Sequence, residues 1–190
     1  MIRVAAILLI LIVGSCASSL GPPRNMSNAC SIKAERPGWF TAMTRTQRRW
    51  GVPVNVQMAT IWRESHFRPK ARTPRKYALG FIPTGRVSSA YGYAQAIDGT
   101  WDWYKRDTGK RFARRDDFDD ASDFIGWYMN ETVSRNGIPL DDAYRQYLAY
   151  HEGHTGYSRG TYRSKSFLLR AAAQVRDRSA LYGNQLASCT

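Results

Sequence analysis

The segment from Gly51 to Ser65 constrains the fold most, because it has the spacing of one helix with a helix breaker near each end. Pro53 suits a first helical position, where its missing N–H would be unpaired anyway, and Pro69 cannot extend the helix. Apolar residues recur at i, i+4 and i+7, which predicts a face packed against a core: Val54, Met58 and Ile61. We therefore predict a core helix that ends close to Glu64.

Glu64 follows Ile61 by three positions and so lies at the edge of this apolar face. Partial burial disfavours the charged form of a carboxyl group, so we expect the pKa of Glu64 to lie nearer neutrality than usual. A carboxyl that keeps its proton near neutral pH can serve as a general acid. The alternative is an ordinary helix-end glutamate, solvated or paired with Arg63 or Arg68.

The rest of the chain predicts a mainly helical single domain. Further helices are expected over residues 37–50, 98–109, 121–135, 141–150 and about 164–181. The last of them would bury Phe167, Leu168, Ala171, Ala172 and Val175. Between residues 70 and 89, prolines and glycines interrupt the pattern, and the apolar run 77–82 could pair as a small hairpin. We expect this irregular stretch to form one wall of the cleft that Glu64 faces.

Residues 1–15 have the pattern of an export signal. Arg3 precedes an almost wholly aliphatic run, residues 4–13, which is too short to span a bilayer. The run ends in Gly14-Ser15-Cys16, which resembles the lipobox of bacterial lipoproteins, whose cysteine is lipidated and becomes the new N-terminus. We expect residues 1–15 to be removed, residues 16–33 to form a lipidated tether and residues 34–190 to fold. The alternative is an ordinary secretory signal followed by an unrelated cysteine.

Lipidation at Cys16 would supply more than one acyl chain, which exceeds the threshold for stable anchoring. Ala17 follows the cysteine, and in Gram-negative lipoproteins this residue in place of Asp implies passage to the outer membrane. We therefore expect a protein on the periplasmic face of the outer membrane, in an oxidising compartment. There Cys30 and Cys189 would pair as a disulfide; the alternative is two free thiols.

The formal charge of the chain is +13, which favours an anionic partner. Nucleic acid, anionic lipid and a cell-wall polymer bearing carboxylates all fit that charge. Because the leader predicts export, we expect no nucleic-acid partner and favour the wall polymer and the membrane.

Three short motifs occur in order along the mature part of the chain. Residues 64–71 read ESHFRPKA, residues 92–95 read GYAQ, and residues 149–153 read AYHEG. They resemble the ES-x-F-x-P-x-A, GLMQ and AYN-x-G segments of family 1 lytic transglycosylases, the soluble lytic transglycosylase (SLT) domain. The resemblance extends from about Trp50 to Val175. Each motif alone is weak evidence, whereas three in order on the expected helix ends indicate this family.

The resemblance implies a lysozyme-like α fold, of the goose-type lysozyme and SLT kind. It also implies cleavage of the β-1,4 bond between N-acetylmuramic acid and N-acetylglucosamine in peptidoglycan glycan strands, leaving a 1,6-anhydromuramoyl end. Glu64 would be the single acid and base, since in this family the substrate's acetamido group and 6-hydroxyl take the parts of a second carboxylate and of water. No cofactor is implied, and we expect a monomer.

The motif positions also imply roles for individual residues. Tyr150 would hydrogen-bond Glu64 and orient it, Gln95 would bind a sugar amide or hydroxyl, and Ser65 and Ser88 would support the acid or nearby substrate. Read without the family, Tyr150 suits a core position equally well, and Gln95 could cap the following helix. His151 replaces the family's asparagine, and Tyr93-Ala94 replace Leu-Met, which would alter the apolar wall of the cleft.

Residues 151–154, HEGH, invite a zinc interpretation, but they do not form the H-E-x-x-H pattern that places two histidines one helical turn apart. We therefore predict no metal site. Two functional alternatives remain open: a muramidase that uses water on the same fold, and a catalytically silent lipoprotein that binds the wall.

Overall fold

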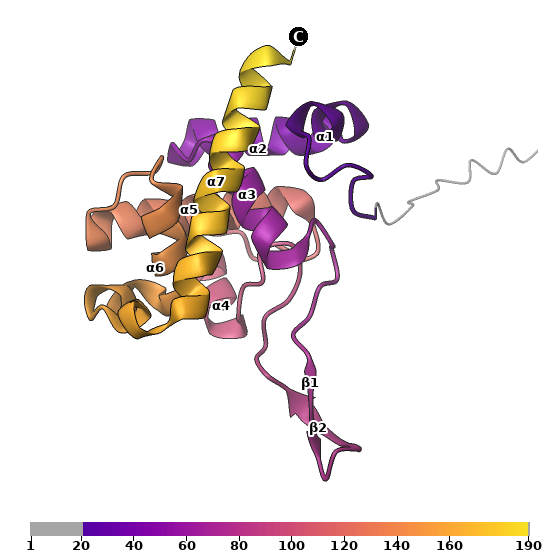
Figure 1. The fold of residues 1–190 in the computed structure, drawn as a ribbon, viewed down its shortest axis with the longest axis vertical. Helices are drawn as coiled ribbons and strands as arrows, with labels where there is room; N and C mark the ends of the chain where they lie inside the picture. Colours follow the sequence, from indigo (N-terminus) through magenta and orange to yellow (C-terminus); the bar gives the residue numbers. More distant parts are fainter. Residues whose placement is uncertain (1–20, 190) are drawn as a thin grey trace, which may run out of the picture.

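The computed structural model describes residues 21–189, in which seven α-helices, one short 3-10 helix and one two-stranded sheet occur (Figure 1). The elements are α1 (Ala29–Glu35), α2 (Pro37–Trp50), α3 (Val54–Ser65), β1 (Arg75–Ala78), β2 (Ile82–Arg86), α4 (Asp98–Thr108), α5 (Phe118–Asn136), α6 (Ala143–Ser158), η1 (Thr161–Ser164) and α7 (Ser166–Ser188). The prediction of a mainly α fold with a small hairpin is confirmed. The export signal and Cys16 lie outside the described residues.

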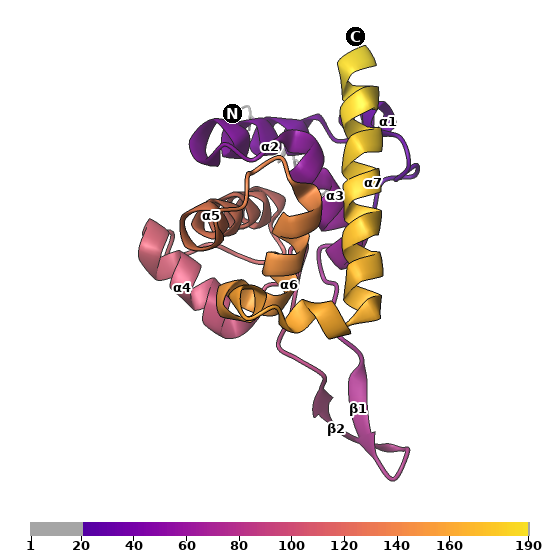
Figure 2. The same cartoon turned by 60° about the vertical axis from the view of Figure 1, so that its left-hand side comes forward.

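Helix α3 is the central element of the fold. It packs along α7 and also contacts α2 and α5 (Figures 1 and 2). Six consecutive residues of this helix, from Val56 to Ile61, are buried, so the core surrounds α3 on most of its sides. The helix ends at Ser65, where His66 takes a left-handed conformation with φ 51°. The predicted core helix and its end beside Glu64 are therefore both observed, although Val54 is only partly buried.

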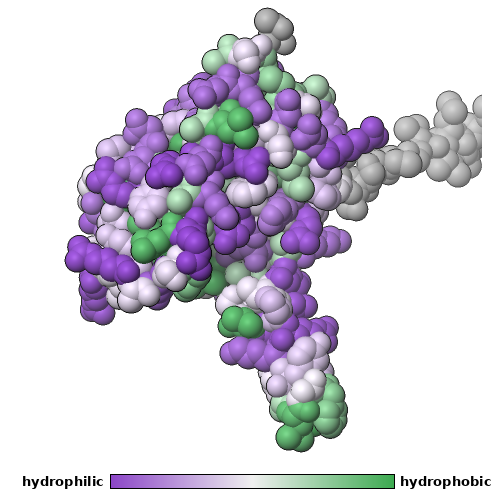
Figure 3. All heavy atoms as spheres, in the orientation of Figure 1, coloured by the Kyte–Doolittle hydropathy of each residue, from purple (hydrophilic) through white to green (hydrophobic). Residues whose placement is uncertain are grey.

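The hairpin of β1 and β2 projects away from the helical body (Figures 1 and 2). The strands pair antiparallel, with Ala78 opposite Ile82, and every residue in both strands is exposed. Apolar side chains gather at its tip (Figure 3). The predicted pairing is confirmed, but within residues 21–189 the two strands pack only against each other, so they stand clear of the helical body.

Helices α2 and α5 approach each other closely at Gly126. A Cβ atom at this position would lie 2.4 Å from Cγ2 of Thr46 and 2.8 Å from Cδ1 of Trp50, so only glycine fits there. Next to this contact, the Thr46 and Ser122 hydroxyls are 2.9 Å apart, and Ser122 donates to Oε1 of Gln57 at 2.8 Å. This buried polar chain joins α2, α5 and α3, and its satisfied groups fix how the three helices pack.

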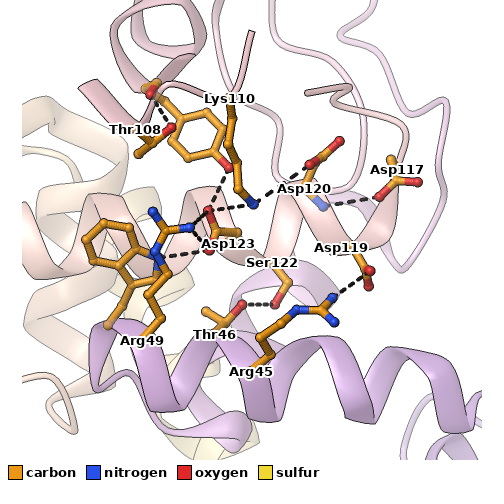
Figure 4. A network of polar contacts seen from close by, with 12 residues as sticks. Arg45, Thr46, Arg49, Thr108, Lys110, Asp117, Asp119, Asp120, Ser122 and Asp123 are labelled. Atoms are coloured by element: carbon orange, nitrogen blue, oxygen red, sulfur yellow. Dashed lines mark hydrogen bonds and ion pairs between the residues drawn. The ribbon is translucent and has the colours of Figure 1, made fainter. Parts of the chain in front are cut away.

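Asp123 is a nearly buried carboxylate that binds several elements together (Figure 4). It accepts hydrogen bonds from Trp50 Nε1 at 2.9 Å and from the Tyr104 hydroxyl at 2.8 Å, and Lys110 Nζ lies 3.0 Å away. Burial alone would raise the pKa of Asp123, but these donors outweigh burial and lower the pKa. The charged form therefore ties α2 and the end of α4 to α5.

The N-terminal part of the described chain belongs to the folded body earlier than predicted. Helix α1 buries Ala29 and Ile32 completely, so the tether predicted over residues 16–33 overlaps the folded domain. Cys30 on α1 and Cys189 after α7 form a disulfide, with their Cα atoms 5.6 Å apart. The bridge therefore joins the first helix to the end of the last one.

The later helices are longer than predicted. Helix α5 begins at Phe118 because the Asp117 side chain caps it, accepting from Asp120 N at 3.1 Å. Helix α7 begins at Ser166, and the prediction that Phe167 is buried is wrong: its ring is exposed and lies edge-on to His151, with ring centroids 5.9 Å apart. Among the elements between residues 21 and 189, we find no helix with the length and apolar character needed to cross a bilayer.

Replacing both Cys30 and Cys189 by serine should lower the free energy of unfolding. The closed loop covers 159 positions of sequence, for which the chain-entropy model gives at most roughly 5 kcal/mol. Thermal unfolding of parent and double variant measures this loss, and binding of glycan fragments at low temperature should persist because no cleft residue lies on α1. An unchanged melting temperature would show that the bridge adds no stability.

Candidate active site

A cleft of about 480 Å³ opens beside the C-terminal end of α3. Glu64 lies in its wall, and the remaining lining comes from the residues on either side of the hairpin, the start of α4, one face of α5 and the middle of α6. The lining residues are Glu64, Thr73, Ser88, Ala90, Gln95, Ala96, Ile97, Thr100, Phe124, Tyr128, Tyr150, His151, Glu152 and Gly153. Segments far apart in the sequence thus meet around one carboxyl group.

Burial raises the pKa of Glu64 to about 7, while a hydrogen bond from Tyr147 and the charge of Arg63 oppose the rise without cancelling it. The residue is half-buried and lines the cleft, so its carboxyl group is partly withdrawn from water but can be reached from the cleft. A carboxyl group with this pKa is about equally populated as acid and base at neutral pH. The upward shift expected from its place at the edge of the apolar face is therefore present.

The hydrogen bond to Glu64 comes from Tyr147, one turn before the tyrosine that the motif predicts. The hydroxyl of Tyr150 instead donates to the carbonyl oxygen of Ala94 at 2.6 Å. Tyr150 does line the cleft, but its hydroxyl fastens α6 to the loop before α4 and does not orient the acid. The predicted role of Tyr150 is corrected accordingly, since both tyrosines lie on the inner side of α6 and only the packed structure decides which one reaches Glu64.

Gln95 lines the cleft, but part of its amide is used within the protein. Its Nε2 donates to the carbonyl oxygens of Ala71 at 3.0 Å and Gly92 at 2.8 Å. These two bonds hold the loop before α4 in a closed conformation. Gly92 is required there because its φ is 83° and a Cβ atom would lie 1.9 Å from the carbonyl oxygen of Arg115. The carbonyl oxygen Oε1 of Gln95 is therefore the part of the amide available to a ligand.

Of the two predicted serines, only Ser88 reaches the cleft. Ser65 is fully buried, and its hydroxyl donates to the carbonyl oxygen of Ile61 at 3.1 Å, so it cannot touch a substrate and instead satisfies the end of α3. Ser88 lies at the base of the hairpin, where its carbonyl oxygen accepts from the Thr73 hydroxyl at 2.9 Å. The prediction for Ser65 is corrected because a helix-end serine bonds its own helix at i−4.

Tyr93 and Ala94 do not form the wall that their place in the motif suggests. Both are buried, and Tyr93 packs edge-on against Trp39 and Phe118 in the core. The apolar wall of the cleft next to this loop consists of Ala90, Ala96 and Ile97. The prediction that these two substitutions alter the cleft wall is therefore wrong.

His151 lies exposed at the cleft, and the neighbouring Glu152 also lines it, although its sequence position alone does not predict this. The Glu152 side chain is 3% exposed, with Lys165 Nζ 2.8 Å from Oε1 and the Thr161 hydroxyl bonded to Oε2. Burial alone would raise the pKa of Glu152, but the bonds from Lys165, Thr161 and His151 outweigh it and lower the pKa. Glu152 is thus a charged, paired carboxylate in the cleft wall.

The chain changes direction at Gly153, whose φ of 75° and ψ of 157° interrupt α6. Beyond this kink the His154 ring stacks on Tyr128, with centroids 4.4 Å apart, and its Nε2 lies 3.0 Å from the Thr132 hydroxyl. His154 therefore does not join His151 and Glu152 in one site. Within residues 21–189, we find no group of three or more His, Cys, Asp or Glu side chains placed to hold a metal ion.

The family described as Transglycosylase SLT domain matches residues 4–189, so the chain belongs to the Transglycosylase SLT domain family. No curated protein matches the sequence closely enough to count as a relative. Family membership identifies the helical body as a lysozyme-like SLT fold and supports lytic transglycosylase activity on peptidoglycan in general.

Replacing Tyr147 by Phe should raise the pKa of Glu64 further above about 7, because the lost hydrogen bond favours the ionised form. Titration of carbon-13-labelled carboxyl groups by NMR measures the shift without relying on turnover. Tyr144→Phe removes a hydroxyl from the same helix outside the cleft and should leave the titration unchanged. A Glu64 signal that titrates alike in Tyr147→Phe and the parent would rule out the assigned hydrogen bond.

Replacing Glu64 by Gln should stabilise the fold at high pH. The pKa of Glu64 rises from 4.5 to about 7 on folding, so the folded parent binds the proton more tightly and loses stability as the pH rises from about 4.5 through 7. Glutamine carries no such proton. Thermal unfolding should therefore show little difference at pH 4 and a more stable variant at pH 8.5, by at most about 3 kcal/mol. An equal difference at both pH values would contradict the raised pKa.

Proposed function

We propose that the protein is a lytic transglycosylase that cleaves the β-1,4 bond between N-acetylmuramic acid and N-acetylglucosamine and leaves a 1,6-anhydromuramoyl end. The observation that carries the proposal is the carboxyl group of Glu64, which faces the cleft with a pKa raised to about 7. Family membership supports peptidoglycan as the substrate class.

In the proposed reaction Glu64 acts twice. Its protonated carboxyl gives the proton to the glycosidic oxygen as the bond from that oxygen to the anomeric carbon of the muramoyl residue breaks. The resulting carboxylate then takes the proton from the 6-hydroxyl of the same sugar as that oxygen bonds to the anomeric carbon. Atoms and charge balance without water, and Glu64 ends protonated as it began. A pKa near the working pH suits a group that must both give and accept a proton.

Glu152 bears on the choice between this reaction and hydrolysis. Retaining and inverting glycosidases use a second carboxylate as nucleophile or as base toward water. Glu152 is the other carboxylate that lines the cleft, and its two oxygens are already paired with Lys165 and Thr161. A carboxylate bound in this way is a poor nucleophile and a poor base. This pairing favours a mechanism that relies on Glu64 alone.

The remaining parts of the cleft fit a glycan strand. Oε1 of Gln95, the Ser88 hydroxyl and the His151 ring offer polar groups for sugar hydroxyls and acetamido groups. Ala96 and Ile97 offer apolar surface beside them. We assign these residues to substrate binding, with Tyr150 holding the loop of Gln95 in place through Ala94.

We also propose that Cys16 is lipidated and holds the enzyme, as a monomer, on the periplasmic face of the outer membrane. The support is in the sequence: an aliphatic run, the small residues Gly14 and Ser15, and a cysteine at the end of the run. The proposed reaction needs no cofactor, and an exported chain would not meet nucleic acid.

Digestion of isolated peptidoglycan followed by mass spectrometry of the products tests the proposal. Glycan fragments with anhydromuramoyl ends are expected from the parent, and Glu64→Gln should lower their rate of release by at least ~100-fold, the usual scale of general acid catalysis. Glu131→Gln makes the same change on α5 outside the cleft and serves as the matched control.

The other outcomes are equally distinct. Reducing ends in place of anhydro ends would identify a muramidase on the same fold. No products from parent protein that still binds the wall would identify a silent wall-binding lipoprotein. Turnover by Glu64→Gln within a few-fold of the parent would refute the role of Glu64.

A further inference from the structure

The tip of the β1–β2 hairpin exposes large apolar side chains that do not belong to the lining of the cleft. Leu79 is 83% exposed and Phe81 71% exposed, and Tyr77 and Ile82 are exposed beside them. They gather at the far end of the projecting arm (Figure 3). Phe112, 94% exposed, is a comparably exposed aromatic elsewhere on the protein. A cluster of apolar side chains on a projecting arm indicates a contact surface more strongly than scattered ones do.

The charged side chains of the stem that carries this tip are all basic. Residues 66–97 contain six Lys and Arg side chains and no Asp or Glu. Three of the six lie in the strands themselves: Arg75, Lys76 and Arg86. None of the six forms an ion pair with any acidic group of residues 21–189; Arg86, for example, donates to the carbonyl oxygen of Thr73 at 2.6 Å. The stem therefore carries positive charge that the described part of the protein does not neutralise.

The hairpin has no packing partner within the described chain. Its two strands contact each other, and all nine of their residues are exposed. A two-stranded hairpin without a packed face is only marginally stable in water, and its open edges invite pairing. An apolar tip on such an element gains stability when something covers it.

We propose that the hairpin tip inserts into the headgroup region of an anionic lipid bilayer. An apolar wedge with basic residues just behind it matches the layers of such a surface, in which acyl chains lie beneath a plane of negative headgroups. Tyr77 and Phe81 are aromatic residues of the kind that occupy this interface. Positive charge along the stem on both strands complements a charged plane better than it complements a single pocket on a protein.

The position of the N-terminal residues fits the same surface. Gly21, the first described residue, lies beside residues 68–72, which lead into β1. Only four residues of sequence separate it from Cys16, so the two Cα atoms are five positions apart, a span of at most about 18 Å when fully extended. The lipid anchor proposed at Cys16 would therefore keep the base of the hairpin close to the bilayer. The hairpin would be a second membrane contact, and since Thr73 and Ser88 at its base line the cleft, it would fix the cleft relative to the membrane.

Vesicle binding by the signal-processed chain carrying Cys16→Ser tests the tip without the contribution of acyl chains. Sedimentation with phosphatidylglycerol-rich vesicles should retain this protein, and pure phosphatidylcholine vesicles should retain it much less. Leu79→Asp with Phe81→Asp should weaken binding to the anionic vesicles at least ~10-fold, because two charged groups would replace the apolar wedge. Phe112→Asp is the matched control and should bind as the parent does.

A fluorescent label gives a second measurement that reports the tip itself. In the Cys16→Ser chain, Cys30 and Cys189 are joined, so Leu79→Cys supplies one free thiol for an environment-sensitive dye. Its emission should shift to the blue on adding anionic vesicles, and the same dye at Phe112→Cys should not respond.

The outcomes that would overturn the proposal are specific. Vesicle binding that is equal in the parent and the Asp double variant, or a dye at position 79 that stays in water while the protein is bound, would refute tip insertion. Hairpin-dependent binding to isolated peptidoglycan with none to vesicles would assign the tip to the wall instead. Product release from isolated peptidoglycan by the double variant should match the parent, which separates this test from that of Glu64.

Discussion

Two carboxyl groups that lose water on folding, in opposite environments, determine how this fold works. Asp123 and Glu64 both lose water on folding, and that loss alone would raise the pKa of each. Asp123 receives hydrogen bonds from the side chains around it, including Trp50 and Tyr104, and stays ionised (Figure 4). Glu64 receives one, from Tyr147, and its pKa rises to about 7. The number of hydrogen-bond donors around each carboxyl group therefore decides its role. Asp123 stays charged and holds the structure together, whereas Glu64 can transfer a proton.

The charged Asp123 matters to Glu64 because it fixes the positions of the helices against which α3 packs. Its partners come from α2, from α4 and from the loop after α4, so ionisation of one side chain holds three elements on α5. The same pair of helices meets at Gly126, and the hydroxyl chain from Thr46 through Ser122 reaches Gln57 of α3. Helix α3 is thus held from the side by satisfied polar groups, and its C-terminal end delivers Glu64 to the cleft.

Local sequence pattern predicted the parts of the site that depend on one helix, and it failed where several elements meet. The spacing of α3 and its breakers located the carboxyl group of Glu64 at the helix end. It could not distinguish Tyr147 from Tyr150, because both tyrosines lie on one side of α6 and the rotation of that helix against α3 decides which hydroxyl reaches the acid. Glu152 was missed as a cleft residue for the same reason, since its partner Lys165 follows it by thirteen positions across a kink and a 3-10 helix.

The base of the hairpin explains how the chain carries a projecting arm without disturbing the cleft. The Thr73 hydroxyl donates to the carbonyl oxygen of Ser88, and Gly92 N donates to the carbonyl oxygen of Ala71 at 3.0 Å, so the two ends of the arm are held together next to the body. Beyond this closure the strands pack against no other element of residues 21–189, and the cost of closing a loop grows only slowly with its length. The residues between Thr73 and Ser88 are therefore free to acquire a surface of their own, while Thr73, Ser88 and the loop of Gln95 keep the geometry that the cleft needs.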